Sequence, residues 1–142
     1  MTRVIVGLGT CGVAAGAEET FRALRQELAG RGEEVQLGRT GCIGMCYQEP
    51  LVEVRGEDGS RYLYGKLDSK KVGRLASEHL AEGKPIDEWL VWTERGTGAG
   101  ADYLDRQTRI VLRNCGRIDP ESMIAVIRAS GSFASTTVRS AS

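Results

Sequence analysis

The sequence has few aromatic residues, a single histidine and no surplus of charge of either sign. Aromatic residues make up 6% of the 142 residues, and 19 Lys and Arg balance 19 Asp and Glu. A protein that mainly binds nucleic acid or an anionic membrane usually carries a basic surplus, so this balance argues against both partners. With one histidine and no carboxylate pair placed by a motif, the sequence also offers no acid–base or nucleophilic catalytic set.

Long apolar runs are also missing. No segment approaches the roughly 18 apolar residues of a membrane span, and the start, MTRVIVGLGT, lacks the apolar core and cleavage site of a secretion signal. We therefore expect a cytoplasmic protein without membrane insertion. Thiols stay reduced in the cytoplasm, so clustered cysteines there indicate metal or redox chemistry more often than disulfides.

The first part of the chain, residues 1–92, has the pattern of one α/β domain with a mixed (α+β) sheet. The expected elements are a strand at 3–6, a helix ending before Gly30, a strand at 35–37, a hairpin of 51–55 and 61–64, and a helix after Asp68. Strand, helix and strand in succession predict two parallel strands with a right-handed crossover. The order β-α-β-β-β-α resembles a thioredoxin-like arrangement.

The rest of the chain divides into three parts by composition. Residues 93–102 are rich in Gly and Thr and are expected to form a linker. A short C-terminal arm over 103–128 would hold a strand at 108–112 and a helix over 120–129 that begins after Asp119. The tail, 129–142, is small and polar, which predicts disorder.

Three of the four cysteines follow the two strands that are expected to be parallel. Cys11 comes after the first strand, and Cys42 and Cys46 come after the second. Adjacent parallel strands end at the same edge of a sheet, so these thiols should converge there. Gly41 and Gly44 would let the backbone approach a bound group closely. The alternative is a tight loop with two purely structural cysteines.

Three segments resemble the thioredoxin-like [2Fe-2S] ferredoxins, and together they cover about residues 3–92. They are 3-RVIVGLGTCGVAAGAEETF-21, 40-TGCIGMCYQEPLVEV-54 and 64-YGKLDSKKVGRLASEHL-80. Such ferredoxins occur alone, as the small iron–sulfur subunit of the NADH-oxidising module of respiratory complex I, and as extensions of NADH-binding subunits. The resemblance implies an electron-transfer module, related to NADH:acceptor oxidoreductases, with a [2Fe-2S] cluster on Cys11, Cys42 and Cys46.

A further segment, 102-DYLDRQTRIVLRNCGRIDPES-122, resembles the start of the flavin-bearing NADH-binding subunit of those enzymes. The resemblance implies that this subunit, or another redox subunit, is the partner. No G-x-G-x-x-G layout occurs in the sequence. We therefore expect no FMN or NAD site in this chain and no dehydrogenase activity from the chain alone.

The sequence departs from the family at the first loop. The family's cluster takes four cysteines, but the usual first-loop positions fall near Gly7 and on Gly12, with Cys11 one place earlier. A noncysteine ligand could complete the set, and Tyr47 is near in sequence. A partner could supply the ligand, or the domain could have lost its cluster and serve as a docking scaffold for a flavoprotein. Cys115 lies beyond the linker, where a structural role is expected.

The remaining residues that could carry chemistry favour simpler interpretations. His79 would complete a zinc set with the three thiols on paper, but a partly exposed histidine near a helix end is expected instead. The C-x-x-C spacing of thiol–disulfide exchange is missing. Trp89 and Trp92 could anchor a partner or close the core. Four arginines are interpreted as docking or solvated charges: Arg106, Arg109, Arg113 and Arg117.

Overall fold

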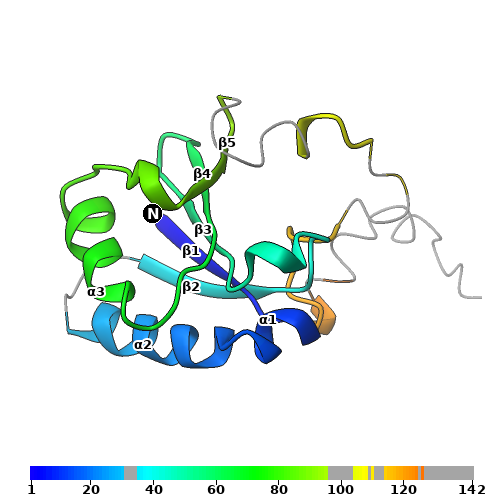
Figure 1. The fold of residues 1–142 in the computed structure, drawn as a ribbon, viewed down its shortest axis with the longest axis horizontal. Coiled ribbons are helices and arrows are strands. Elements are labelled where there is room, and N and C mark those ends of the chain that lie inside the picture. The colour runs from blue at the N-terminus through cyan, green and yellow to red at the C-terminus, as the bar shows by residue number, and fades with distance from the viewer. Residues whose placement is uncertain (31–34, 96–103, 109, 111–113, 125, 127–142) are drawn as a thin grey trace, which may run out of the picture.

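The computed structural model describes residues 1–30, 35–95, 104–108, 110, 114–124 and 126 (Figure 1). Its elements are β1 (Thr2–Gly7), α1 (Thr10–Ala14), α2 (Ala17–Ala29), β2 (Val35–Thr40), η1 (Cys46–Gln48), β3 (Val52–Arg55), β4 (Arg61–Tyr64), α3 (Val72–Arg74), η2 (Leu75–Ala81), η3 (Asp87–Trp89) and β5 (Leu90–Thr93). The strands form one five-stranded sheet in the order β2-β1-β3-β4-β5.

The sheet is mixed, as the sequence predicts. β1 pairs with β2 in parallel, with Gly7 opposite Thr40 at the end of both strands. β3 pairs with β1 and with β4 in antiparallel fashion, and β5 adds to β4 at the far edge. The helix α2 makes the crossover between β1 and β2, which is the connection that a parallel pair requires.

One face of the sheet carries the main core. Val4 and Val6 of β1 are fully buried, while Val52 and Val54 of β3 are 0% and 1% exposed. They pack with Leu24 of α2 and with Val72 and Leu75 of the segment that follows β4. Strand side chains alternate between faces, so the apolar residues at every second position all point toward the helices.

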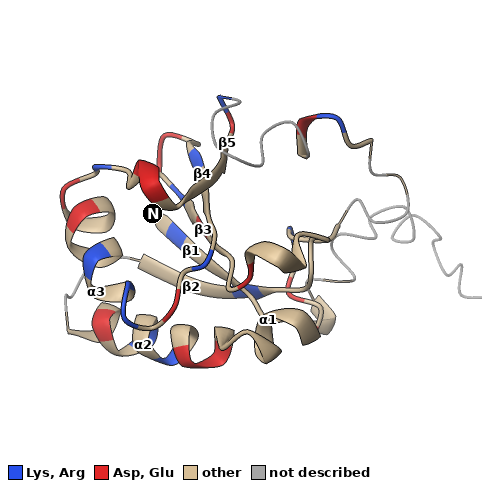
Figure 2. Cartoon of the chain, in the orientation of Figure 1, with Lys and Arg blue, Asp and Glu red and all other residues tan. Residues whose placement is uncertain are grey.

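The opposite face is smaller and partly polar. Met45, Leu51, Leu63 and Val91 form a second buried cluster, against which Trp92 and Leu104 pack. Glu53 also lies on this side and is held by Arg55 (2.9 Å) and Arg61 (2.6 Å). Elsewhere, acidic and basic residues are interspersed along the elements (Figure 2).

The tryptophan segment forms part of the fold. Residues 90–93 make the fifth strand, which the sequence pattern did not predict. Trp89 packs on the main core, with the Lys71 and Arg74 head groups 5.3 and 4.8 Å from its ring centre. Trp92 packs on the second cluster. Both tryptophans therefore pack on the core, and a partner-anchoring role for them stays a prediction.

The expectation that His79 is partly exposed is wrong. Its side chain is 8% exposed, and its Nδ1 lies 2.7 Å from the Tyr64 hydroxyl. The spacing of Val72, Leu75 and His79 places all three on the inward face of the second helix, which is π-helical over η2. The hydroxyl satisfies the imidazole there, so the ring can be buried at little cost.

Much of the predicted C-terminal structure lies outside the described residues. This applies to most of the linker, to most of the strand at 108–112, to four of the ten residues of the helix at 120–129, to Arg109 and Arg113, and to the tail. Asp119 does accept a hydrogen bond from the Glu121 N–H, at 3.0 Å. Within the described ranges, every helix is too short or too polar to cross a bilayer.

We expect the buried His79 to make folding stability sensitive to pH. Burial lowers the pKa of His79, so below about pH 6.5 the unfolded chain binds a proton that the folded chain does not. Stability should then fall as the pH drops from 7 to 5.5, by at most about 1.4 kcal/mol per pH unit from this group. Urea unfolding at several pH values measures the slope, which should be smaller in His79→Gln. His79 is the only histidine, so an imidazole NMR titration midpoint above 6.5 contradicts this account.

Candidate functional site

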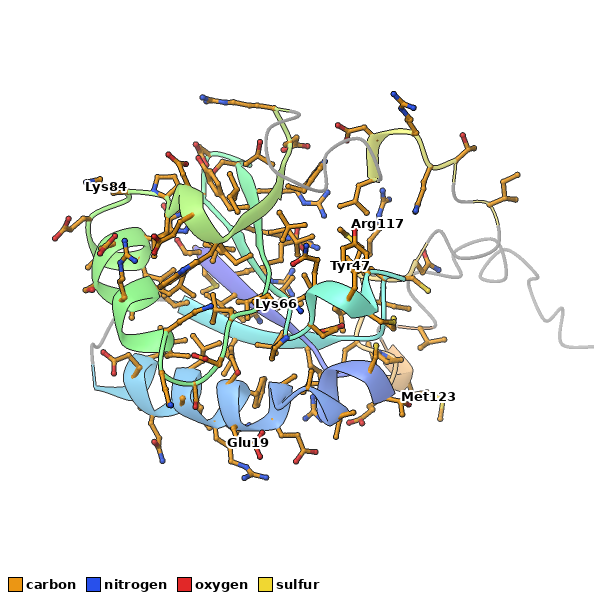
Figure 3. All side chains as sticks on the ribbon, in the orientation of Figure 1. Glu19, Tyr47, Lys66, Lys84, Arg117 and Met123 are labelled. Atoms are coloured by element: carbon orange, nitrogen blue, oxygen red, sulfur yellow. The ribbon has the colours of Figure 1, made fainter. Side chains whose placement is uncertain are left out.

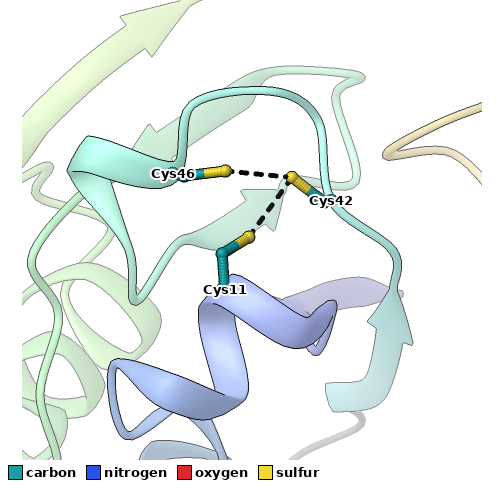
Figure 4. Close-up of side chains that lie close together, drawn as sticks. All are labelled: Cys11, Cys42 and Cys46. Carbon is teal, nitrogen blue, oxygen red and sulfur yellow. Dashed lines mark hydrogen bonds between the residues drawn. The ribbon is translucent and has the colours of Figure 1, made fainter.

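Three thiols meet at the edge of the sheet where β1 and β2 end (Figure 4). Cys11 lies in α1, directly after β1, and Cys42 and Cys46 lie on the loop and the short helix η1 after β2. The Cys11 and Cys42 sulfurs are 3.3 Å apart, and the Cys42 and Cys46 sulfurs are 3.5 Å apart. All three sulfurs lie within 4.8 Å of one another. The chain therefore brings together the three residues that the sequence singles out.

Glycines allow the two loops to approach so closely. A Cβ on Gly9 would stand 2.9 Å from both the backbone nitrogen and the Cβ of Cys42, a distance that real Cβ atoms essentially never show. Gly44 has φ of 89°, in the left-handed region that favours glycine, and its N–H donates to the Cys42 sulfur at 3.2 Å. Each of these contacts depends on the missing side chain.

The same packing explains why the first-loop cysteine stands at position 11. A Cβ on Gly12 would overlap the carbonyl oxygen of Gly7, which is backbone and cannot move aside. A side chain at position 12 is therefore incompatible with this turn. Cys11 points to the other loop instead.

Electrostatics distinguishes the thiols from one another. Burial, together with hydrogen bonds to Cys46 and Cys42, raises the pKa of Cys11 to about 12. Burial opposes ionisation of Cys42 as well, but the Gly44 N–H and the neighbouring thiols donate to its sulfur and lower its pKa overall. Cys42, whose sulfur lies between the other two, therefore ionises more readily than Cys11.

A carboxylate that sequence reasoning missed also lies at the site. Glu49 is 4% exposed, and its Oε1 lies 3.8 Å from the Cys11 sulfur. Its Oε2 accepts the Leu51 N–H at 2.8 Å, and burial raises the pKa of its carboxyl group. The only sequence signal is its place between the cysteine loop and Pro50. Tyr47, by contrast, is 57% exposed and projects from η1 (Figure 3).

The other residues considered as ligands lie elsewhere. His79 faces Tyr64 in the core, so the zinc set of three cysteines and one histidine does not form. Cys115 is half-buried and lines a cavity of about 300 Å³ between the second face of the sheet and the arm. Its sulfur does not join the group of three. None of the four cysteines forms a disulfide.

Comparison with known proteins assigns the chain to a family. No family model matches the sequence. Over 87 residues the chain is 30% identical to the HndB subunit of the NADP-reducing hydrogenase of Solidesulfovibrio fructosivorans, a stretch that covers 61% of this chain and 69% of that subunit. The chain belongs to the HndB family.

Solved structures match this HndB family member in fold. A thioredoxin-like [2Fe-2S] ferredoxin from Aquifex aeolicus aligns with a TM-score of 0.60 and 19% identity, over 66% of this chain and 93% of that one. Another structure of that ferredoxin, in its wild-type form, aligns with a TM-score of 0.58 and 21% identity, over 65% and 97% of the two chains. The thioredoxin-like fold expected from the sequence is confirmed.

Gly9→Ala should separate the two loops of the site. The added methyl group meets backbone atoms of Cys42, so α1 must move away from the cysteine loop at a cost of about 1–3 kcal/mol. We expect a lower midpoint in urea and several-fold less iron bound after anaerobic reconstitution. Gly73→Ala is the matched control, because nothing lies within 4 Å of its Cβ. Equal iron content in the two variants contradicts the steric argument.

Proposed function

We propose that the protein is an electron-transfer subunit that holds a [2Fe-2S] cluster on Cys11, Cys42 and Cys46. The observation that carries the proposal is the convergence of three free thiols, from two separate loops, within 4.8 Å. Thiolates are the usual protein ligands of iron–sulfur clusters. Membership of a hydrogenase-subunit family and the ferredoxin fold support the proposal.

The chemistry of the site fits such a group. Sulfur donors select iron–sulfur clusters, zinc or copper rather than magnesium or calcium. The Gly44 N–H already donates to the Cys42 sulfur, and hydrogen bonds to ligand sulfurs are one means of tuning a cluster's potential. Cys46 is exposed and Cys11 is half-buried. The site therefore has one side in the protein and one side open to a partner.

The cluster would supply one-electron transfer, and the protein would supply its position and surroundings. The exposed edge at Cys46 is the side from which a partner can approach within electron-transfer distance. The proposed partner is another redox subunit, and more specifically the flavin-bearing NADH-binding subunit whose first segment the arm resembles. The proposal requires a compartment that keeps the ligand thiols reduced, which the cytoplasm does.

Serine substitution tests the proposal. In protein purified without oxygen, Cys42→Ser and Cys46→Ser should each lose the visible absorption and the reversible one-electron signal, because each loses a thiolate ligand. Cys115→Ser should retain both, since its sulfur lies outside the group of three. Iron and acid-labile sulfide are counted on the same samples.

Two outcomes would overturn the proposal. One is a wild-type protein that stays colourless after reconstitution, which would leave the docking scaffold as the function of the domain. The other is unchanged redox behaviour in both serine variants.

A further inference from the structure

Glu49 occupies the space that the missing fourth ligand would need. The resemblance to the ferredoxins predicts ligands near positions 7 and 12, where this chain has glycine. A Cβ on Gly7 would lie 3.3 and 3.4 Å from the two carboxylate oxygens of Glu49, and a Cβ on Gly12 would lie 3.1 Å from Oε2. The carboxylate is therefore the nearest group to the side-chain position of Gly7, and it also lies beside that of Gly12, where the Gly7 carbonyl is closer still.

The environment of Glu49 is unusual for a buried acid. In the part of the chain that the structure describes, no Lys or Arg side chain forms an ion pair with it. Its hydrogen-bond partners are the Leu51 N–H at Oε2 and the Cys11 thiol at Oε1, which is a long contact of 3.8 Å. Buried carboxylates normally pair with a cation or coordinate a metal. Oε1 is the oxygen that faces the thiols.

We infer that Glu49 is the fourth protein ligand of the site, through Oε1. This inference rests on the proposed function. Three thiolates and one carboxylate carry the same formal charge as four thiolates, so the substitution leaves the charge of the ligand set unchanged. Coordination requires the carboxylate form, and any proton on Glu49 leaves to solvent when the metal centre binds. The Leu51 N–H keeps Oε2 in place and so orients the carboxylate.

The geometry favours Glu49 over the other noncysteine candidates in the described chain. Tyr47 is exposed on the surface of η1 and His79 faces Tyr64 in the core, whereas the Glu49 Oε1 lies 3.8 Å from the Cys11 sulfur. Among the described glutamates, Glu53 is the only other one that is almost fully buried, and both of its carboxylate oxygens are held by Arg55 and Arg61. Among the described residues, Glu49 combines burial, an oxygen directed to a thiol and the absence of a cationic partner.

Four proteins test the inference after anaerobic reconstitution: wild type, Glu49→Gln, Glu53→Gln and the double variant Gly7→Cys/Glu49→Ala. Glu49→Gln keeps the shape of the side chain but not its charge, and we expect it to release iron to a chelator at least about tenfold faster than wild type. Glu53→Gln, the buried-glutamate control, should release iron at the wild-type rate. The double variant removes the carboxylate and places a thiol in the same space, so it should restore slow release.

A spectroscopic readout identifies the ligand directly. Wild-type protein grown on ¹³C-glutamate and reduced to the paramagnetic state should show a ¹³C hyperfine coupling that is absent in Glu49→Gln and in the double variant. If wild type holds the cluster but shows no such coupling, or if Glu49→Gln releases iron at the wild-type rate, Glu49 is not a ligand and the proposed function still stands. If wild type binds no iron, the proposed function and this inference fail together.

Discussion

Parallel pairing between β1 and β2 is the constraint on which the site depends, since it is what makes two distant loops begin at the same place. Gly7 and Thr40 are the last paired residues of the two strands, so Cys11 and Cys42 start from adjacent backbones. The pairing is stabilised in turn by the crossover helix, which buries Leu24 against Val4 and Val6. The same apolar alternation that builds the core therefore determines where the thiols lie.

Close approach is the second constraint, and it is met by leaving side chains out. Gly9 admits the Cys42 backbone, Gly12 admits the Gly7 carbonyl, and Gly7 admits the carboxylate of Glu49. Interiors are packed at nearly crystalline density, so a side chain omitted at one position must be matched by atoms from another. In the first loop, the atoms that take the place of the missing side chain of Gly7 belong to Glu49, which follows the second cysteine loop. Replacing a cysteine with glycine at this site therefore also changes which atoms pack there.

The sequence predicts the parts of this structure that depend on periodicity and topology. The short apolar run in 3–6 and the helical spacing from Ala17 to Leu28 indicate the β-α-β unit, and the unit places Cys11 beside Cys42 and Cys46. β5 was missed because 86-IDEWLVW-92 has no clear alternation, and its pairing is decided by the edge of β4. The burial of His79 depends on the Tyr64 hydroxyl, and that of Glu49 on side chains absent from Gly7 and Gly12. Burial that depends on a residue far away in the sequence leaves no local sequence pattern by which it could be predicted.

The described residues of the arm contact the end of β2 and the cysteine loop. Thr40, at the end of β2, donates to the Ile118 carbonyl at 3.0 Å, and Arg39 pairs with Asp119 at 3.5 Å. Exposed ion pairs of this kind contribute about 0–1 kcal/mol, so charge alone does not position the arm.

The tighter constraint is steric, because a Cβ on Gly116 would overlap the side chain of Ile43. Ile43 lies between Cys42 and Cys46, so Gly116, in the described part of the arm, packs directly on the loop that carries two of the three thiols. The arm residues around Gly116 and Ile118 therefore pack with the cysteine loop and the end of β2.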